Sequence, residues 1–395
     1  MTGQPLQSVK RPKAKLSWSD PVLRSILFQI IAIAMFATGI WFLVHNTLSN
    51  LATSHISTGF AFLSREAGFA IGESIISYGP ADTYLRAIAV GLLNTLVVAG
   101  LGIVLATLLG TVIGVARLSK NWLIAKLAAI YVEIIRNIPL LLQMFFWYSI
   151  ISENMPGPRQ ALHPIAGVFI SNRGIKVPGL LGDGLVWLFV GVGLAMLVTI
   201  LINNWASRRQ AQTGQIFPVW RVGLLLVLAL PLLCWGLSGQ SIIVDMPALK
   251  GFNFAGGLTL TPEFAALLVG LVVYTAAFIA EVVRAGIQSV SNGQWEASDA
   301  LGLKRSLSLR LVVLPQALRV IIPPMTSQYL NITKNSSLAV AIGYPDIVSI
   351  INTTLNQTGQ AIEGIMIIMA AYLTVSLSIS VFMNWYNKRI ALTER

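Results

Sequence analysis

Long stretches without charge restrict most strongly how this chain can fold. The segment GLLNTLVVAGLGIVLATLLGTVIG, residues 91–114, has no charged side chain. A helix that crosses a bilayer needs about 20 mainly apolar residues, because lipid cannot satisfy exposed backbone groups. Similar runs predict eight membrane helices, at about 26–44, 85–116, 122–152, 185–203, 219–237, 263–288, 317–335 and 362–385.

The composition agrees with an all-α integral membrane protein. Hydrophobic residues make up 55% of the 395 residues and charged residues 11%, and the mean hydropathy is +0.74. This is too apolar for a single water-soluble core of ordinary composition. The run from Ile26 to Val44 is longer than a usual signal-peptide core and lacks an obvious cleavage site after it. We therefore interpret it as an uncleaved first membrane helix.

The distribution of basic residues predicts the orientation of the chain. The formal net charge is +12, but the basic residues are dispersed among the loops, which argues against nucleic-acid binding. If the N-terminus is cytoplasmic, 18 basic residues fall in cytoplasmic segments and six in outer segments. This asymmetry follows the positive-inside rule and predicts that both termini are cytoplasmic.

Several kinds of chemistry have no support in the sequence. Cys234 is the only cysteine, and the three histidines are too scattered to suggest a metal site. No phosphate-binding loop of the form G-x-x-x-x-G-K followed by Ser or Thr occurs, and no pair of nucleophile and base stands out. We expect a non-catalytic chain that binds no metal and no cofactor.

The stretch EASDALGLKRSLSLRLVVLP, residues 296–315, carries three basic residues between two apolar runs, so we expect it outside the bilayer. Gly302 is well placed to end one short helix, and leucines at helical spacing give a second helix an apolar face. Pro315 is expected to stop that second helix. The pattern fits either a compact element that docks on another protein or an amphipathic helix on the membrane surface.

The same stretch resembles the EAA loop of binding-protein-dependent ABC transporter permeases. The resemblance lies in Glu296-Ala297-Ser298, in Gly302, and in Val312 and Leu314-Pro315 after nine intervening residues. Ser298 stands where alanine is usual, and Val312 stands where isoleucine is common. Both changes keep the side chain small or branched. The resemblance implies an ATPase-coupling role for Glu296, Ala297, Ser298, Gly302, Leu314 and Pro315.

Three further motifs are YVEIIRNIPLLLQ (131–143), IAEVVRAGIQSVSNGQWEAS (279–298) and LPQALRVIIPPMTSQYLNITKNSSLAVAIGYPD (314–346). They resemble the polar amino acid permease subfamily. The N-terminal extension and the inserted helix pair look most like the Q-type subunit of the general L-amino-acid transporters of proteobacteria. The resemblance implies a five-helix permease core in two parts, 85–152 and 263–390, with a cytoplasmic coupling loop at 289–315. Residues 1–84 would hold the cytoplasmic N-terminus, the first membrane helix and a periplasmic interfacial segment, and 153–262 an insertion with two further spans.

The resemblance also implies the partners of an importer in the bacterial inner membrane. These are a second, similar but non-identical permease, two cytoplasmic ATPase subunits that bind ATP and Mg, and a periplasmic amino-acid-binding protein. The competing prediction is an ion-coupled secondary amino acid transporter. That class would have a poised intramembrane carboxylate and inverted repeats, and neither is clear in the sequence.

Two Glu-x-x-Arg pairs fall inside or near predicted spans. Glu133 and Arg136, and Glu281 and Arg284, each have i,i+3 spacing on one helix face. Because a lone charge in a span is costly, we predict that each glutamate pairs with its neighbouring arginine. Such pairs either shape the transport path or only lock the packing of helices.

Lys334 has no acidic neighbour at helical spacing and lies among polar residues. Pro323 and Pro324 are expected to interrupt the helix before it, and interrupted helices with polar linings commonly contact solutes in transporters. The alternative is that Lys334 extends to the outer interface while the amides cap a helix end. The candidates for the substrate path are Lys334, Asn331, Asn335 and Ser336, with Gln143 and Gln328 as weaker candidates.

Overall fold

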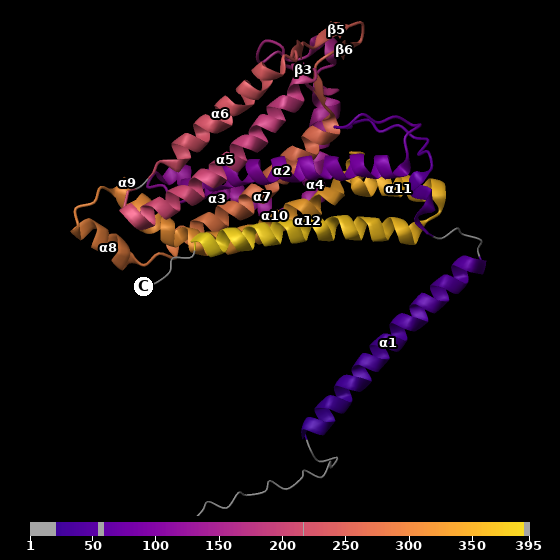
Figure 1. The fold of residues 1–395 in the computed structure, drawn as a ribbon, viewed down its shortest axis with the longest axis horizontal. Coiled ribbons are helices and arrows are strands. Elements are labelled where there is room, and N and C mark those ends of the chain that lie inside the picture. The colour runs from indigo at the N-terminus through magenta and orange to yellow at the C-terminus, as the bar shows by residue number, and fades with distance from the viewer. Residues whose placement is uncertain (1–20, 54–58, 216, 391–395) are drawn as a thin grey trace, which may run out of the picture.

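Helices dominate the computed structural model, which describes residues 21–53, 59–215 and 217–390 (Figure 1). Seven described helices are long and apolar enough to cross a membrane, and one sharply bent pair supplies an eighth span if it is counted as one. This agrees with the eight predicted spans. The long helices are α1 (Pro21–Thr53), α2 (Tyr84–Ala116), α3 (Trp122–Asn137), α4 (Leu140–Ser149), α5 (Gly184–Thr213), α6 (Val219–Ser238), α7 (Pro262–Gln288), α10 (Leu314–Asn335), α11 (Ile347–Thr358) and α12 (Ala361–Ile390).

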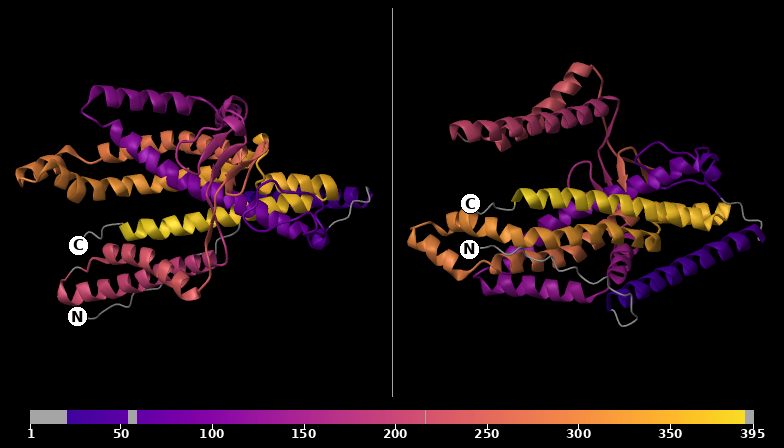
Figure 2. Two further views of the ribbon diagram at one scale, coloured as in Figure 1. Left: turned by 90° about the horizontal axis from the view of Figure 1, so that it is seen from above. Right: turned by 60° about the horizontal axis from the view of Figure 1, so that its bottom comes forward.

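The centre of the bundle is α7, which packs most extensively against α2 (Figure 2). Glycines on α2 permit this approach. A Cβ at Gly110 would lie 2.7 Å from the Ile279 Cβ, and one at Gly114 would lie 2.8 Å from the Ala280 carbonyl oxygen. Both positions therefore exclude a larger side chain, as expected where two membrane helices pack closely. α3, α4 and α10 pack on other parts of α7, and α12 packs on α10.

The third predicted span is not one straight helix, because the axes of α3 and α4 differ by 104°. Pro139, which has no backbone N–H, lies at the bend. The Gln143 side-chain amide donates to the carbonyl oxygens of Ile135 (2.9 Å) and Ile138 (3.0 Å). These bonds satisfy oxygens that the end of α3 leaves free, which is necessary within a membrane. The amide of Gln143 is thus occupied in bridging the bend.

Two expectations about prolines are wrong. α10 continues through Pro323 and Pro324, and the chain leaves the α-helix only at Ser336, where the 3₁₀ helix η5 (Ser336–Ile342) begins. Pro315 does not stop a helix either, because it lies in the first turn of α10, after the π-helical turn η4 (Leu309–Val313). Proline has a φ value that suits a helix, and its missing donor matters least in a first turn.

Residues 59–83 cover the end of the bundle where α11 lies, opposite the end that carries the helix α8 (Asn292–Ala300) (Figure 1). The segment contains the 3₁₀ helix η1 (Phe60–Ser64), and Phe62 is buried there in a cluster with Tyr84. The buried Asn94 amide donates to the carbonyl oxygens of Glu73 and Pro345, both at 2.9 Å. One side chain on α2 thereby fixes two segments that are distant in sequence.

Asp346 caps α11, since its Oδ1 accepts a hydrogen bond from the Ser349 N–H at 2.8 Å. Its side chain is fully buried, and burial raises the pKa of this carboxyl to about 7. The unfolded chain releases the same proton near pH 4, so the folded state binds more protons between these values and should lose stability as the pH rises from about 4 to about 7.

The Asp346→Asn variant keeps a good helix cap and should lack this component of the pH dependence. Melting temperatures of both purified proteins in detergent, measured across that pH range, test the expectation. The melting temperature of the parent should fall by several degrees relative to that of the variant as the pH rises. Parallel pH profiles would contradict it.

The insertion between the two parts of the bundle contains the predicted pair of helices, which form a hairpin. It also contains short strands, which were not predicted. α5 and α6 pack on each other, and a Cβ at Gly191 would lie only 2.4 Å from the Pro231 Cα. The hairpin diverges from the other helices in Figures 1 and 2. The flanking residues form antiparallel pairs in the orders β1-β2-β7, β3-β4 and β5-β6. The strands are β1 (Phe169–Ser171), β2 (Gly174–Val177), β3 (Gly179–Leu181), β4 (Ile243–Asp245), β5 (Ala248–Lys250), β6 (Asn253–Ala255) and β7 (Leu258–Leu260).

Candidate functional site

The stretch that resembles the EAA loop forms two short helices joined by a turn, and we name residues 292–308 the knuckle. α8 is followed by Gly302 and then by α9 (Arg305–Ser308). Gly302 adopts a φ of +69°, and its N–H donates to the Asp299 carbonyl oxygen at 2.9 Å. A left-handed glycine just after a helix closes its last turn. The turn therefore lies where the sequence indicates.

The inner side of the knuckle is held by buried serines. Ser298 and Ser308 are 2% and 0% exposed. The Ser298 hydroxyl donates to the Trp295 carbonyl oxygen at 2.8 Å, and the Ser298 carbonyl oxygen accepts from the Leu303 N–H at 3.1 Å. Arg305 lies over the Trp295 ring, with 5.0 Å from its guanidinium carbon to the ring centroid. Serine is therefore satisfied at a position where alanine is usual.

The outer side of the knuckle is open. Glu296, Ala297 and Gly302 are exposed, and a Cβ built on Gly302 meets no atom within 4 Å. Apolar side chains are also exposed, by 42% to 79%, at Leu301 and Leu307 of the knuckle and at Leu309 and Leu311 of η4, which follows it. Leu314, which is 39% exposed, and Pro315 lie in the first turn of α10.

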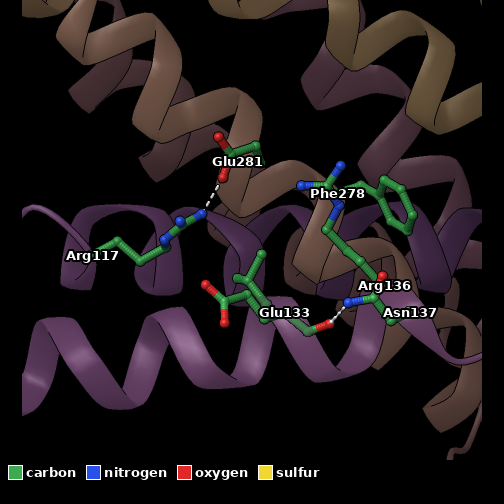
Figure 3. Close-up of a pocket in the computed structure, with 7 residues that line it drawn as sticks. Arg117, Glu133, Arg136, Asn137, Phe278 and Glu281 are labelled. Atoms are coloured by element: carbon green, nitrogen blue, oxygen red, sulfur yellow. Dashed lines mark hydrogen bonds and ion pairs between the residues drawn. The ribbon is translucent and has the colours of Figure 1, made fainter.

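A charged cavity of about 460 Å³ lies among α2, α3 and α7 (Figure 3). Two arginines and two glutamates contribute to its wall, so these four side chains sum to zero formal charge. The cavity is lined by Arg117, Val132, Glu133, Arg136, Asn137, Phe278 and Glu281.

The ion pairs differ from those predicted. Glu281 bonds to Arg284, as expected, and also to Arg117, which follows the last residue of α2. Arg136 does not pair with Glu133 and instead lies over the Phe278 ring, 5.0 Å from its centroid. Among the described residues, the Glu133 carboxylate has no ion-pair or hydrogen-bond partner. The aromatic face thus attracts the arginine that spacing alone assigned to Glu133.

The other predicted polar residues lie on α10 and its continuation. Lys334 and Asn331 are exposed, Asn335 and Gln328 are partly buried, and the buried Ser336 hydroxyl donates to the Thr333 carbonyl oxygen at 2.7 Å. None of them lines the charged cavity, whose walls come from α2, α3 and α7. The candidates therefore occupy separate regions of the bundle.

Comparison with known proteins identifies the family. Residues 203–392, which include the knuckle, match the family described as binding-protein-dependent transport system inner membrane component. YhdX of Escherichia coli, named an amino-acid ABC transporter permease protein, is 53% identical over 385 residues, which cover 97% of this chain and 98% of YhdX. The chain belongs to this family. Two other relatives of this inner-membrane component also match nearly the whole chain.

The general L-amino acid transport system permease protein AapQ of Rhizobium johnstonii is 48% identical over 95% of this chain and 94% of its own length. The glutamate/glutamine/aspartate/asparagine transport system permease protein BztB of Rhodobacter capsulatus is 42% identical over 95% and 96%. The likeness therefore includes the N-terminal helix and the insertion as well as the bundle.

Sequence reasoning missed four of the residues that line the charged cavity of this inner-membrane component, namely Arg117, Val132, Asn137 and Phe278. Arg117 directly follows an uncharged run, so its position at the end of a span was predictable from the sequence. Its partner Glu281 is 164 residues away, which is beyond any local spacing rule. Phe278 looks like any other apolar residue of α7 until α3 is packed against it.

Proposed function

We propose that this chain is the transmembrane permease subunit of an ATP-driven, binding-protein-dependent importer of L-amino acids. The knuckle is the observation that carries the proposal. It presents the exposed leucines Leu301 and Leu307 before the predicted span at 317–335, and short helices with an apolar face commonly dock into a groove of a partner. The names of YhdX, AapQ and BztB all refer to amino acids and support the substrate class.

In this proposal, two separate cytoplasmic ATPase subunits bind ATP and Mg, and each receives the knuckle of one permease chain. A single helical segment, Arg305–Ile342, connects the knuckle to the bundle, so a displacement of the knuckle is transmitted to α10. ATP binding would draw the knuckles together and shift the bundle from an inward-facing to an outward-facing population.

The remaining partners follow the same scheme. A second permease, similar but not identical, completes the transmembrane unit, and a periplasmic amino-acid-binding protein delivers substrate at the end where α11 lies. The excess of basic residues in the segments assigned to the cytoplasm, 18 against six, supports an inner-membrane orientation with both termini and the knuckle in the cytoplasm.

Ser327, Asn331 and Lys334 repeat at i, i+4 and i+7 spacing and are all exposed on α10. A polar stripe of this kind is unfavourable against lipid, so we assign it to the water-filled path. Asn335 and Ser336 follow the stripe and stay candidates for the path, with Gln328 as a weaker one.

Replacing Lys334 with alanine should reduce amino-acid uptake by about tenfold without reducing assembly, because a charge of this kind contributes roughly 1–2 kcal/mol to an interaction with a carboxylate. Uptake is measured per assembled complex, with Lys388→Ala near the end of α12 as the matched control. Uptake kinetics equal to those of the parent for each amino acid tested would remove Lys334 from the path.

The subunit composition tests the proposed function directly. The complex is purified from detergent through a tag on this chain, and its intact mass is measured. Two copies of an ATPase and one copy of a second permease are expected per copy of this chain. A chain that is isolated alone and still transports amino acids would contradict the proposal.

A further inference from the structure

The charged cavity holds one carboxylate and one guanidinium that no other charged group neutralises. Glu281 already binds both Arg117 and Arg284. In the described part of the chain, Glu133 and Arg136 take part in no ion pair. They lie one turn apart on α3 and both line the cavity (Figure 3). An intramembrane charge without a counter-charge is a functional candidate because it is costly to keep.

We infer that this cavity binds the α-ammonium and α-carboxylate groups of a zwitterionic amino acid, with Glu133 facing the ammonium and Arg136 facing the carboxylate. The inference rests on the proposed function, because it assigns a place within the bundle to the proposed substrate. It goes beyond that function by naming the two side chains that recognise the groups common to all α-amino acids.

The chemistry of the two side chains fits these groups. A guanidinium presents a planar set of donors that match a carboxylate, and a free carboxylate accepts the hydrogen bonds of an ammonium group. Phe278 holds the guanidinium by its ring face, which orients the arginine without neutralising its charge. The Arg117–Glu281–Arg284 network fixes the opposite wall.

The dimensions and the charge balance agree with a small zwitterion. A volume of about 460 Å³ lies within the range of roughly 300–1,000 Å³ that is typical of small-molecule sites. A zwitterion adds no net charge to a wall of two arginines and two glutamates, whereas a simple cation or anion would leave one of the free groups unpaired. Glu133 also lies about 16 Å along α3 from its first residue, and the cavity extends to Arg117 at the C-terminal end of α2.

The experiment compares L-glutamine with two analogues that each lack one group. Glutaramic acid lacks the ammonium, and 4-aminobutanamide lacks the carboxylate. The complete complex, purified in detergent without added binding protein, is titrated with each compound, and apparent affinities are obtained from the rise in melting temperature. The parent should bind each analogue about 10- to 100-fold more weakly than L-glutamine, because each lacks one charge-assisted contact.

Two variants test which side chain binds the ammonium group and which binds the carboxylate group. Glu133→Gln should weaken L-glutamine binding and abolish the preference for L-glutamine over glutaramic acid, while keeping the preference over 4-aminobutanamide. Arg136→Gln should have the reciprocal effect. Glu153→Gln and Arg173→Gln, which change exposed residues outside the cavity, serve as matched controls and should keep both preferences.

Three results would overturn the inference. The first is a parent complex that imports L-glutamine but responds equally to all three compounds, or to none, and this result does not depend on any variant folding. The second is a pair of variants that leave both preferences intact. The third is loss of the second permease from the variant complexes, which would assign Glu133 and Arg136 to the interface between subunits. If instead the complex imports no amino acid at all, the proposed function itself fails.

Discussion

Replacing Gly302 with leucine should lower ATP-driven uptake by one to three powers of ten, while the chain remains in the membrane. Gly302 has a φ of +69°, and an L side chain there costs about 1–2 kcal/mol in backbone strain. The space around Gly302 is open in this chain, so any clash arises from the docked partner, at about another 1–3 kcal/mol. Since about 1.4 kcal/mol is tenfold, docking should weaken by this range.

Gly359 offers a matched control for the backbone strain of the Gly302→Leu variant. Gly359 ends α11 with a φ of +72°, and a Cβ there also meets no atom within 4 Å, but it lies at the opposite end of the bundle. Gly359→Leu should share the strain and keep the ATPase bound. Purified variants are compared for retained ATPase and for uptake per complex. A Gly302→Leu complex that keeps its ATPase and transports at the parental rate would show that the knuckle does not dock.

Replacing Glu281 with glutamine should destabilise the folded chain by about 2–4 kcal/mol, because it leaves Arg117 and Arg284 without their shared carboxylate. The three side chains are between 15% and 30% exposed, so the expected loss is below that of a fully buried pair. Denaturant titration of the parent and the variant in detergent measures the difference in their free energies of unfolding.

A double variant separates the ion pair from the loss of packing. Arg117→Gln combined with Glu281→Gln removes one cation together with the anion, and Arg284 keeps its hydrogen bond to Gln288 at 2.6 Å. The double variant should therefore be less destabilised than the sum of the two single variants. Strict additivity would contradict the Arg117–Glu281 ion pair drawn in Figure 3.

The positions of the membrane helices were predictable, because a run of uncharged residues long enough to span a bilayer has few other folds available. The run at 85–116 coincides with α2, and that at 263–288 coincides with α7 to within one residue. The bend between α3 and α4 was not predicted. Pro139 was visible in the sequence, but only the Gln143 amide, which bridges to Ile135 and Ile138, makes a sharp break acceptable inside a membrane.

The candidate site was predicted less completely than the fold. Spacing along a helix identifies which residues can meet, but it does not show which competing neighbour arrives from another helix. Arg136 had Glu133 one turn away and is instead held by Phe278 on α7. Glu281 met its expected partner Arg284 and also Arg117. The knuckle was predicted better, because the left-handed turn at Gly302 depends on local sequence alone.

The source of energy tests the central claim most directly. The purified complex is reconstituted into liposomes with binding protein and a radiolabelled amino acid, and uptake is measured with internal ATP or with an imposed proton or sodium gradient. We predict uptake that requires ATP and binding protein and does not respond to either gradient. Uptake by this chain alone, driven by an ion gradient without ATP, would contradict the account and identify a secondary transporter.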